Sequence, residues 1–392
     1  MKKVVITSAK RTAIGSFNGA LASFSSGQLG SFAIKAILED SKIDPLQIDE
    51  VIMGNVLMGG QGQAPARQSA IFAGLPNSVE CMTINKMCGS GLKAVMLAHQ
   101  AILSSDADII IAGGQESMSN APYFLMNARN GYRLGNGEIK DSIIVDGLWD
   151  AYNNIHMGSC AESCAKDFSF GREELDNFAI ESYKRANNAI NSGRFSDEIF
   201  PIKISSKSGD IIVDKDEEPG KVKYDKISTL KPVFDKNGVV TAANASSIND
   251  GAAALLVMSE DKAKEFGYKP LVEIIAQSSA AKAPIEFTTA PADAINKVLK
   301  KANLKTTDIG LYEINEAFAV VSLAVNKLLG LDSKNVNVNG GAVALGHPIG
   351  ASGARILVSL IHEMKKRNTE FGLASLCIGG GEASALIVKN YN

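Results

Sequence analysis

Apolar residues along the chain follow two alternating periodicities, which together predict a mixed α/β fold. Short runs rich in β-branched residues are typical of strands and occur at residues 4–7, 51–53, 109–112, 311–314, 336–338 and 374–378. Between them, apolar residues recur every three or four positions, as on one face of a helix, most clearly over residues 92–102, 173–192 and 356–364. Strands that alternate with helices in this way favour a layered sheet covered by helices.

The pattern occurs twice along the chain. Residues 33–38 (AIKAIL) reappear as residues 294–299 (AINKVL), about 260 positions later, and Ser90-Gly91 matches Ser352-Gly353 at nearly the same offset. A strand followed by Asn55 in the first copy corresponds to one followed by Asn315 in the second. We therefore expect two copies of one fold.

The first copy carries a long insertion. Residues 379–388 run without a break in the second copy, whereas Gly113-Gly114 is separated from the similar residues 250–257 by about 135 positions. We expect three parts: a first core half (1–118 plus 250–270), an inserted loop domain (119–249) and a second core half (271–392). Insertions between core elements often carry specificity, so this one is predicted to cover the site.

Composition narrows the class of protein. With 392 residues, 45% of them hydrophobic, the chain has ample material for a large core. A net charge of −2 provides no basic field for nucleic acid, and no apolar run reaches the ~18 residues of a membrane span. The strand that begins at residue 4 leaves no room for a leader, and five cysteines, an odd number, favour reduced thiols. We expect a cytoplasmic protein.

Cys88 is the candidate nucleophile. It lies in Asn85-Lys86-Met87-Cys88-Gly89-Ser90-Gly91, where a helix is predicted to begin. Helix N–H groups and the positive end of the helix dipole lower a thiol pKa, so a thiolate is expected here. Cys81, Cys160 and Cys164 are expected to be structural, because no His or Cys completes a zinc quartet with them.

His347 occupies the matching turn of the second copy, between Gly346 and Pro348. An imidazole with a pKa near neutrality could take the proton of a cysteine. His99 and His362 fall within predicted helices and are interpreted as packing residues. His156, beside Met157 in the insertion, could line a ligand channel.

Two further polar groups end predicted strands. Cys377 precedes Gly379, Gly380 and Gly381, whose N–H groups could bind an oxyanion, and a second thiol there could act as acid and base. Asn315 could position a water, although an Asn at a strand end is often only a turn residue. The glycine-rich stretches match no nucleotide-binding loop.

Together these motifs resemble the thiolase family over nearly the whole chain. The resemblance rests on residues 9–12, 85–91, 113–119, 315–318, 341–355 and 377–381. It implies a duplicated αβαβα layered core with a loop domain, assembled as a homo-oligomer, most often a dimer or a tetramer. It also implies no covalent cofactor, and acetyl-CoA, acetoacetyl-CoA and coenzyme A as substrates and products.

The resemblance also assigns roles. Cys88 would carry an acetyl group as a thioester, and His347 would activate it and, with a water held by Asn315, stabilise the thioester oxyanion. Cys377 would exchange a proton at the reacting carbon, and the N–H groups of Cys88 and Gly379 would form a second oxyanion hole. Candidate substrate contacts are His156, Met157, Tyr183, Lys221, Lys223, Lys226, Ser246, Phe287 and Phe318.

Residues 287–291 and the Ala383-Ser384 ending resemble the mitochondrial-type acetoacetyl-CoA thiolases, which bind potassium. The corresponding positions for K⁺ are Tyr183, Ala242, Ala243, Ala245 and Val343. Glu382 departs from the family's small or neutral residue, and its charge puts the local electrostatics in doubt.

The expected activity is acetyl-CoA C-acetyltransferase, with a degradative 3-ketoacyl-CoA thiolase of broader or 2-methyl-branched specificity as the nearest alternative. A decarboxylating ketoacyl synthase would have His or Asn in place of Cys377. A noncatalytic lipid carrier would lack at least one of Cys88, His347 and Cys377, and all three are present.

Overall fold

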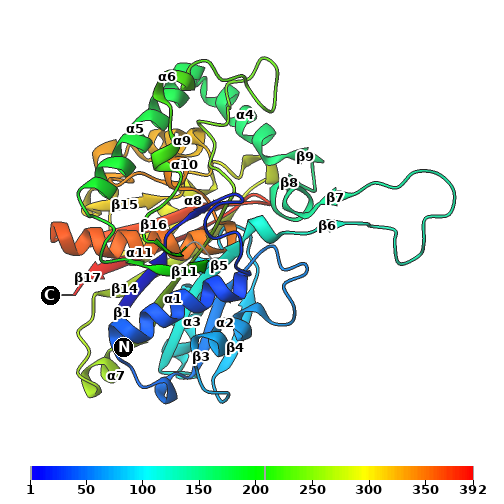
Figure 1. Cartoon of the computed structure of the whole chain (residues 1–392). Helices are drawn as coiled ribbons and strands as arrows, with labels where there is room; N and C mark the ends of the chain where they lie inside the picture. Colours follow the sequence, from blue (N-terminus) through cyan, green and yellow to red (C-terminus); the bar gives the residue numbers. More distant parts are fainter. Residues whose placement is uncertain (1, 207–208, 392) are drawn as a thin grey trace.

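Two similar half-sheets form the core of the molecule (Figure 1). The computed structural model describes residues 2–206 and 209–391. In the first half the strands lie in the order β4 (Glu80–Ile84), β3 (Glu50–Gly54), β5 (Ile109–Ser117), β13 (Asn249–Ser259) and β1 (Val4–Thr12). In the second half the order is β15 (Leu311–Ile314), β16 (Phe371–Ile378), β17 (Glu382–Asn390) and β14 (Val272–Ala281).

Strand directions match between the halves. β3 runs parallel to β5, which is followed by antiparallel β13 and β1; likewise β15 runs parallel to β16, followed by antiparallel β17 and β14. Antiparallel pairing of β1 with β14, where Val5 faces Glu273, joins the two half-sheets. The predicted duplication is therefore present in the strand pairing itself.

The strand expected at residues 336–338 is wrong. Val336 makes only an isolated parallel bridge to Tyr312, at the place where β4 lies in the first half. Asn337 has a positive φ of 47°, and its side-chain amide bonds both the N–H and the carbonyl of Ile314, each at 2.8 Å. A side chain thus replaces the backbone pairing that a strand would have made.

Helices complete five layers. The outer helices are α1 (Ser26–Ser41) and α2 (Pro65–Ala73) on the first half, and α8 (Ala290–Ala302) and α9 (Ala319–Leu329) on the second. Between the half-sheets lie α3 (Ser90–Ser104) and α11 (Ile349–Arg367). Successive strand residues point to opposite faces, so Ile110 packs with α3 and α11 while Ile111 packs with α1.

A long excursion separates β5 from its neighbour β13. It includes α4 (Met157–Phe168), α5 (Arg172–Asn191), α6 (Tyr224–Ile227) and the strand pairs β6 (Tyr123–Phe124) with β7 (Lys140–Asp141), β8 (Trp149–Asp150) with β9 (Ile155–His156), and β11 (Ile202–Ser206) with β12 (Gly209–Val213). β10 (Ile199–Phe200) joins β1. Residues 125–139, between β6 and β7, extend away from the rest of the molecule (Figure 1).

Small elements complete the chain: β2 (Gly15–Ser16), α7 (Glu260–Glu265) and α10 (Ala342–Leu345). All five cysteines are free thiols. Within the described part of the chain, no helix combines the length and apolar character needed to cross a membrane.

Candidate active site

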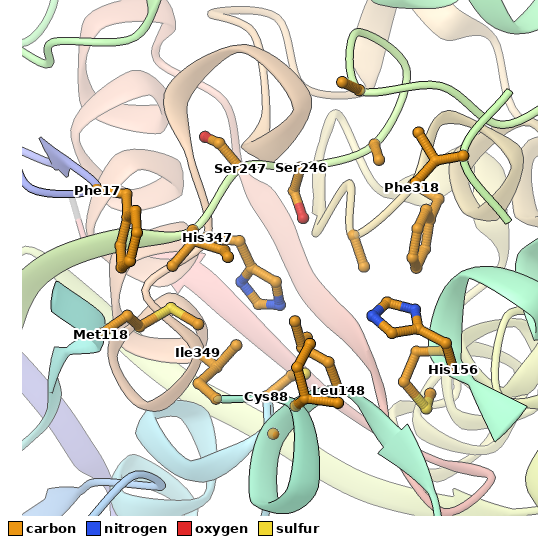
Figure 2. A pocket seen from close by; sticks show the side chains of 18 of the residues that line it. Phe17, Cys88, Met118, Leu148, His156, Ser246, Ser247, Phe318, His347 and Ile349 are labelled. Atoms are coloured by element: carbon orange, nitrogen blue, oxygen red, sulfur yellow. The ribbon is translucent and has the colours of Figure 1, made fainter. Parts of the chain in front are cut away.

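A cavity of about 580 Å³ lies where both halves meet the excursion (Figure 2). Eleven of the predicted residues line it: Cys88, His347, Gly379, His156, Met157, Lys221, Ala242, Ala245, Ser246, Phe287 and Phe318. The other seven do not: Cys377, Asn315, Tyr183, Lys223, Lys226, Ala243 and Val343. Figure 2 shows the rings of His347 and His156 pointing into the cavity from different sides.

Cys88 lies on a tight turn two residues before the first residue of α3. The Ser90 hydroxyl donates to the Met87 carbonyl at 2.6 Å, and Met87 itself has a positive φ of 47°. Gly89 packs closely: a Cβ there would lie 2.4 Å from the terminal methyl carbon of Ile378, which would have to move. The strained turn presents the sulfur to the cavity wall at the junction of the halves.

Burial changes the expected electrostatics of Cys88. The residue packs against an apolar cluster that includes Leu57, Met118 and Ile349. This burial raises the thiol pKa to about 11, although the N–H groups of Gly379 and of Cys88 itself oppose the shift. The expectation of a lowered pKa is therefore wrong for the free protein, because desolvation outweighs the hydrogen bonds and the helix terminus.

His347 is held rigidly from both sides. Its N–H donates to Asn249 Oδ1 at 2.9 Å. Gly346 has a φ of 101°, and a Cβ there would lie 2.4 Å from Asn249 Cγ, so only glycine fits. The Ser352 hydroxyl lies 2.6 Å from His347 Nδ1 and donates to the Pro348 carbonyl at 2.9 Å.

That arrangement favours one tautomer. The Ser352 hydroxyl has a single proton, and with that proton on the Pro348 carbonyl, Nδ1 of His347 is the donor and Nε2 the acceptor. Burial, with a smaller effect of the Arg355 charge, lowers the His347 pKa to about 3. The expected pKa near neutrality is thus wrong, and at pH 7 the group is a neutral base with Nε2 free to accept a proton.

Cys377 and Asn315 lie immediately behind the cavity wall. Cys377 is fully buried near the end of β16, where desolvation and then the neighbouring Cys88 raise its pKa well above the usual range. Asn315 follows β15, and its Nδ2 lies 3.5 Å from His347 Nε2. The structure therefore brings two thiols, an imidazole and an amide together.

The excursion and the second half supply the remaining walls. His156 caps α4, accepting the Gly158 N–H at Nδ1 (3.0 Å), so its proton is on Nε2 and available as a donor. Its ring stacks on Phe234, which contacts Phe318 edge to face. Phe287 is buried against Phe318 and narrows the same region.

Of the three candidate lysines, one lines the cavity and two lie outside it. Lys221 lines the cavity and bonds the Ser16 hydroxyl, whereas Lys223 and Lys226 are exposed and outside the lining. Only Lys221 is thus placed to meet an anionic group of a ligand in this cavity.

Two of the candidate K⁺ residues, Tyr183 and Val343, lie near Glu316. This buried carboxylate accepts from the Ser182 hydroxyl at 2.7 Å and from the Val343 N–H at 3.2 Å. Tyr183 follows Ser182, and burial followed by the charges of Glu218 and Glu316 raises its pKa to about 12. The loop with Ala242, Ala243 and Ala245 runs beside Phe318 through an isolated bridge at Ala245. No group of three or more His, Cys, Asp or Glu in the described residues could hold a metal.

Glu382 has a partner. Its carboxylate forms an ion pair with Lys86, two residues before Cys88. The charge that sequence alone left unexplained thus links the nucleophile turn of the first half to the glycine loop of the second.

Several contributing residues were missed. Glu116 is buried at the end of β5 and accepts from Gly350 N–H (2.8 Å) and Asn55 Nδ2 (2.6 Å), tying the two copies together beside Cys88. Burial raises its pKa to about 7. An acid that ends a buried apolar strand was the available signal. Asn249 and Ser352 carried no signal that separates them from ordinary turn and helix residues.

Comparison with known proteins gives a consistent result. The family profile described as "Thiolase, N-terminal domain" matches residues 4–261, and "Thiolase, C-terminal domain" matches residues 268–390. The acetyl-CoA acetyltransferase of Cupriavidus necator is 53% identical, covering 99% of this chain and 100% of that protein. The mitochondrial acetyl-CoA acetyltransferase of Bos taurus is 51% identical, covering 99% and 92%.

Solved structures agree. The Bacillus anthracis acetyl-CoA acetyltransferase matches with a TM-score of 0.97 at 44% identity, over 100% of this chain and 99% of that one. A thiolase from Ascaris suum, determined in complex with coenzyme A, matches with a TM-score of 0.94 at 44% identity, over 99% and 100%. Because the two family profiles together match nearly the whole sequence and the relatives are about 50% identical over their full length, this chain belongs to the thiolase family.

Proposed function

We propose that the protein is an acetyl-CoA C-acetyltransferase, which condenses two acetyl-CoA molecules into acetoacetyl-CoA and coenzyme A and catalyses the reverse thiolysis. The observation that carries the proposal is that Cys88 and His347 line one cavity, with Cys377 beside Cys88 immediately behind its wall. A nucleophile, a base and a second thiol are what Claisen chemistry on thioesters requires.

In the first step, His347 Nε2 takes the proton of Cys88 as the sulfur attacks the acetyl carbonyl of acetyl-CoA. The N–H groups of Cys88 and Gly379 point at the sulfur and are therefore placed to bind the oxyanion that forms from the carbonyl oxygen of the acetyl group attached to it. Coenzyme A leaves as a thiolate and takes the proton of Cys377, so that an acetyl group remains on Cys88, the proton of Cys88 remains on His347 Nε2, and Cys377 becomes a thiolate.

In the second step, Cys377 removes a proton from the methyl group of another acetyl-CoA. The resulting enolate oxygen is stabilised by donors on the His347 and Asn315 side. Its carbon attacks the acetyl-Cys88 carbonyl, acetoacetyl-CoA forms, and the Cys88 sulfur is released as a thiolate that takes its proton back from His347.

Phe287 and Phe318 favour a short acyl chain, because their rings narrow the cavity. A degradative thiolase for longer or 2-methyl-branched substrates is the alternative. His156 and Lys221 are proposed contacts for the pantetheine and phosphate parts of coenzyme A, with Met157 and Ser246 beside them.

We also propose activation by K⁺ at Tyr183, Ala242, Ala243, Ala245 and Val343. The loop carbonyls fit a monovalent cation, since none of the backbone bonds found outside helices and strands in the described residues uses the oxygens of Ala242, Ala243 or Ala245. A neutral phenol and carbonyls are suitable oxygen ligands, and a bound ion would stabilise the loop beside Phe318.

A homotetramer built as a dimer of dimers is proposed, together with a cytoplasmic location and a role in lipid metabolism. The projecting residues 125–139 expose Leu125, Met126, Leu134 and Ile139, an apolar arm suited to contact another copy. β4 is an edge strand with Met82 exposed, which suits pairing between two copies. Light scattering of the protein with and without residues 126–138 tests the arm, and a dimer in both cases would contradict it.

The decisive experiment measures kcat/KM for thiolysis of acetoacetyl-CoA, 2-methylacetoacetyl-CoA and 3-ketooctanoyl-CoA, in K⁺ and in Na⁺. We expect preference for the four-carbon substrate and higher activity in K⁺. Preference for the eight-carbon substrate would refute the short-chain assignment, and equal activity in both salts would refute the K⁺ proposal. A Cys88→Ser variant with a near-normal rate would refute the mechanism.

A further inference from the structure

Arg355 is a buried charge that the chemistry described above does not use. It lies on α11 and is only 2% exposed. Its Nη2 lies 3.5 Å from Asn315 Oδ1, and its nearest carboxylate oxygen, Oε2 of Glu313, is 3.7 Å from Nη1. Among the described residues, Nε and Nη1 have no hydrogen-bond partner. Stability does not explain a guanidinium whose one side-chain hydrogen bond goes to the site amide.

The contact has a fixed direction, because an arginine can only donate. Asn315 Oδ1 therefore accepts from Arg355, which turns Asn315 Nδ2 toward His347 Nε2. At the far end, His347 Nδ1 donates to Ser352, and Ser352 donates to the Pro348 carbonyl, which can only accept. Because this row of hydrogen bonds has a donor-only group at one end and an acceptor-only group at the other, every hydrogen bond in it points in the same direction.

We propose that Arg355 is a positioning residue, which holds the Asn315 amide so that its N–H faces the reacting atoms and Nε2 of His347 remains the acceptor. Reversing the amide would place an oxygen against Nε2 and against any oxyanion in the same space. The inference rests on the proposed thiolase activity and adds to it the group that orients the oxyanion donor.

Other charged groups surround the row of hydrogen bonds from Arg355 to Ser352. Glu198 and Asp216 from the excursion and Arg11 from β1 act on Arg355, and Glu316 and Glu363 act on Glu313. Glu116, from β5, is bonded to the Gly350 N–H three residues after His347, and Cys88 and Cys377 face the same space. Arg355 is the charged group whose effect on His347 is resolved, and it disfavours protonation of the imidazole.

The test compares thiolysis kinetics of the wild type with Arg355→Met/Glu313→Gln, which replaces Arg355 and its nearest carboxyl group together, so that Glu313 is not left facing an apolar side chain. We expect kcat to fall on the order of 10- to 100-fold, the cost of a hydrogen bond to a charged group, with KM for acetoacetyl-CoA changed less than about threefold. The acid limb of kcat/KM should move to higher pH. Arg355→Lys, which retains a cationic donor, should recover part of kcat and the position of the limb.

An Asn315→Ala background separates positioning from structure. If Arg355 acts through Asn315, the Arg355 change should cost less than about twofold more in that background, whereas multiplying losses would overturn the proposal. If the double variant does not fold, Arg355→Lys in the two backgrounds makes the same comparison. Arg367→Met, on the same helix and bonded to Glu363, is the control and should leave kcat unchanged.

The outcomes distinguish the two proposals. A wild type without thiolase activity would refute the proposed function. An active wild type whose Arg355→Met/Glu313→Gln variant retains kcat and the same acid limb would refute only the role of Arg355.

Discussion

The buried, neutral state of His347 predicts a specific loss of stability in acid. Its pKa falls from 6.5 to about 3 on folding, so between these values the unfolded chain binds a proton at this position and the folded protein does not. The free energy of unfolding must therefore decrease as the pH falls through this window. In this window the free energy of unfolding falls by about 1.4 kcal/mol for each unit of pH, so His347 alone should lower it by about 2 kcal/mol between pH 6.5 and pH 5.

The measurement is urea unfolding of the wild type and of His347→Asn at pH 7.5 and pH 5, at one protein concentration, because subunit association is linked to folding. The variant also loses contacts with Ser352, but that loss is independent of pH and cancels in the difference between the two pH values. The perturbed carboxyls Glu116 and Glu313 are present in both proteins and cancel as well. Equal pH dependence in the two proteins would refute the reasoning.

Three further predictions concern the same site. Iodoacetamide should modify Cys88 slowly at pH 7 and faster above pH 9, because burial raises the pKa of its thiol to about 11. A modification rate that is already constant below pH 7 would contradict this. The Cys88→Ser variant gives the background rate from the other cysteines. Lys86→Glu and Glu382→Lys should each lower kcat/KM by about two- to fivefold, and the variant with both changes should recover the wild-type value, because it restores the ion pair with its charges exchanged. Single variants with the wild-type kcat/KM would show that the pair contributes nothing. Phe287→Ala should raise the ratio of kcat/KM for a six-carbon to that for a four-carbon ketoacyl-CoA by roughly tenfold, and it should lower the melting temperature. An unchanged ratio would show that Phe287 does not lie in the acyl pocket.

The sequence carried the duplication and the chemical groups because both are local features. The strand runs and the helices after Ser90 and Pro348 appear where the apolar spacing predicts them. Cys88, His347, Cys377 and Asn315 could be placed at one edge because equivalent strand ends of a duplicated sheet meet there. The false strand at residues 336–338 arose because Val336 and Val338 alternate as in a strand, while the side chain of Asn337 makes the decisive bonds.

The electrostatics could not be predicted, because they depend on tertiary packing. Cys88 precedes a helix terminus, which by itself favours a thiolate, but Leu57, Met118 and Ile349 come from other parts of the chain and remove water from the sulfur. The same holds for His347, whose depth in the core and distance to Arg355 have no local signature. The partner of Glu382 lies almost 300 positions away along the chain, at Lys86.

A neutral thiol and a neutral imidazole in the free protein have a consequence for control of the reaction. A resting thiolate would be open to oxidation and alkylation, whereas a half-buried, neutral thiol with a pKa of about 11 resists both. The proton moves to His347 only when an oxyanion can form opposite the N–H groups of Cys88 and Gly379, because that new charge is what the donors stabilise. The burial that opposes ionisation at rest therefore makes formation of the nucleophile depend on a bound thioester.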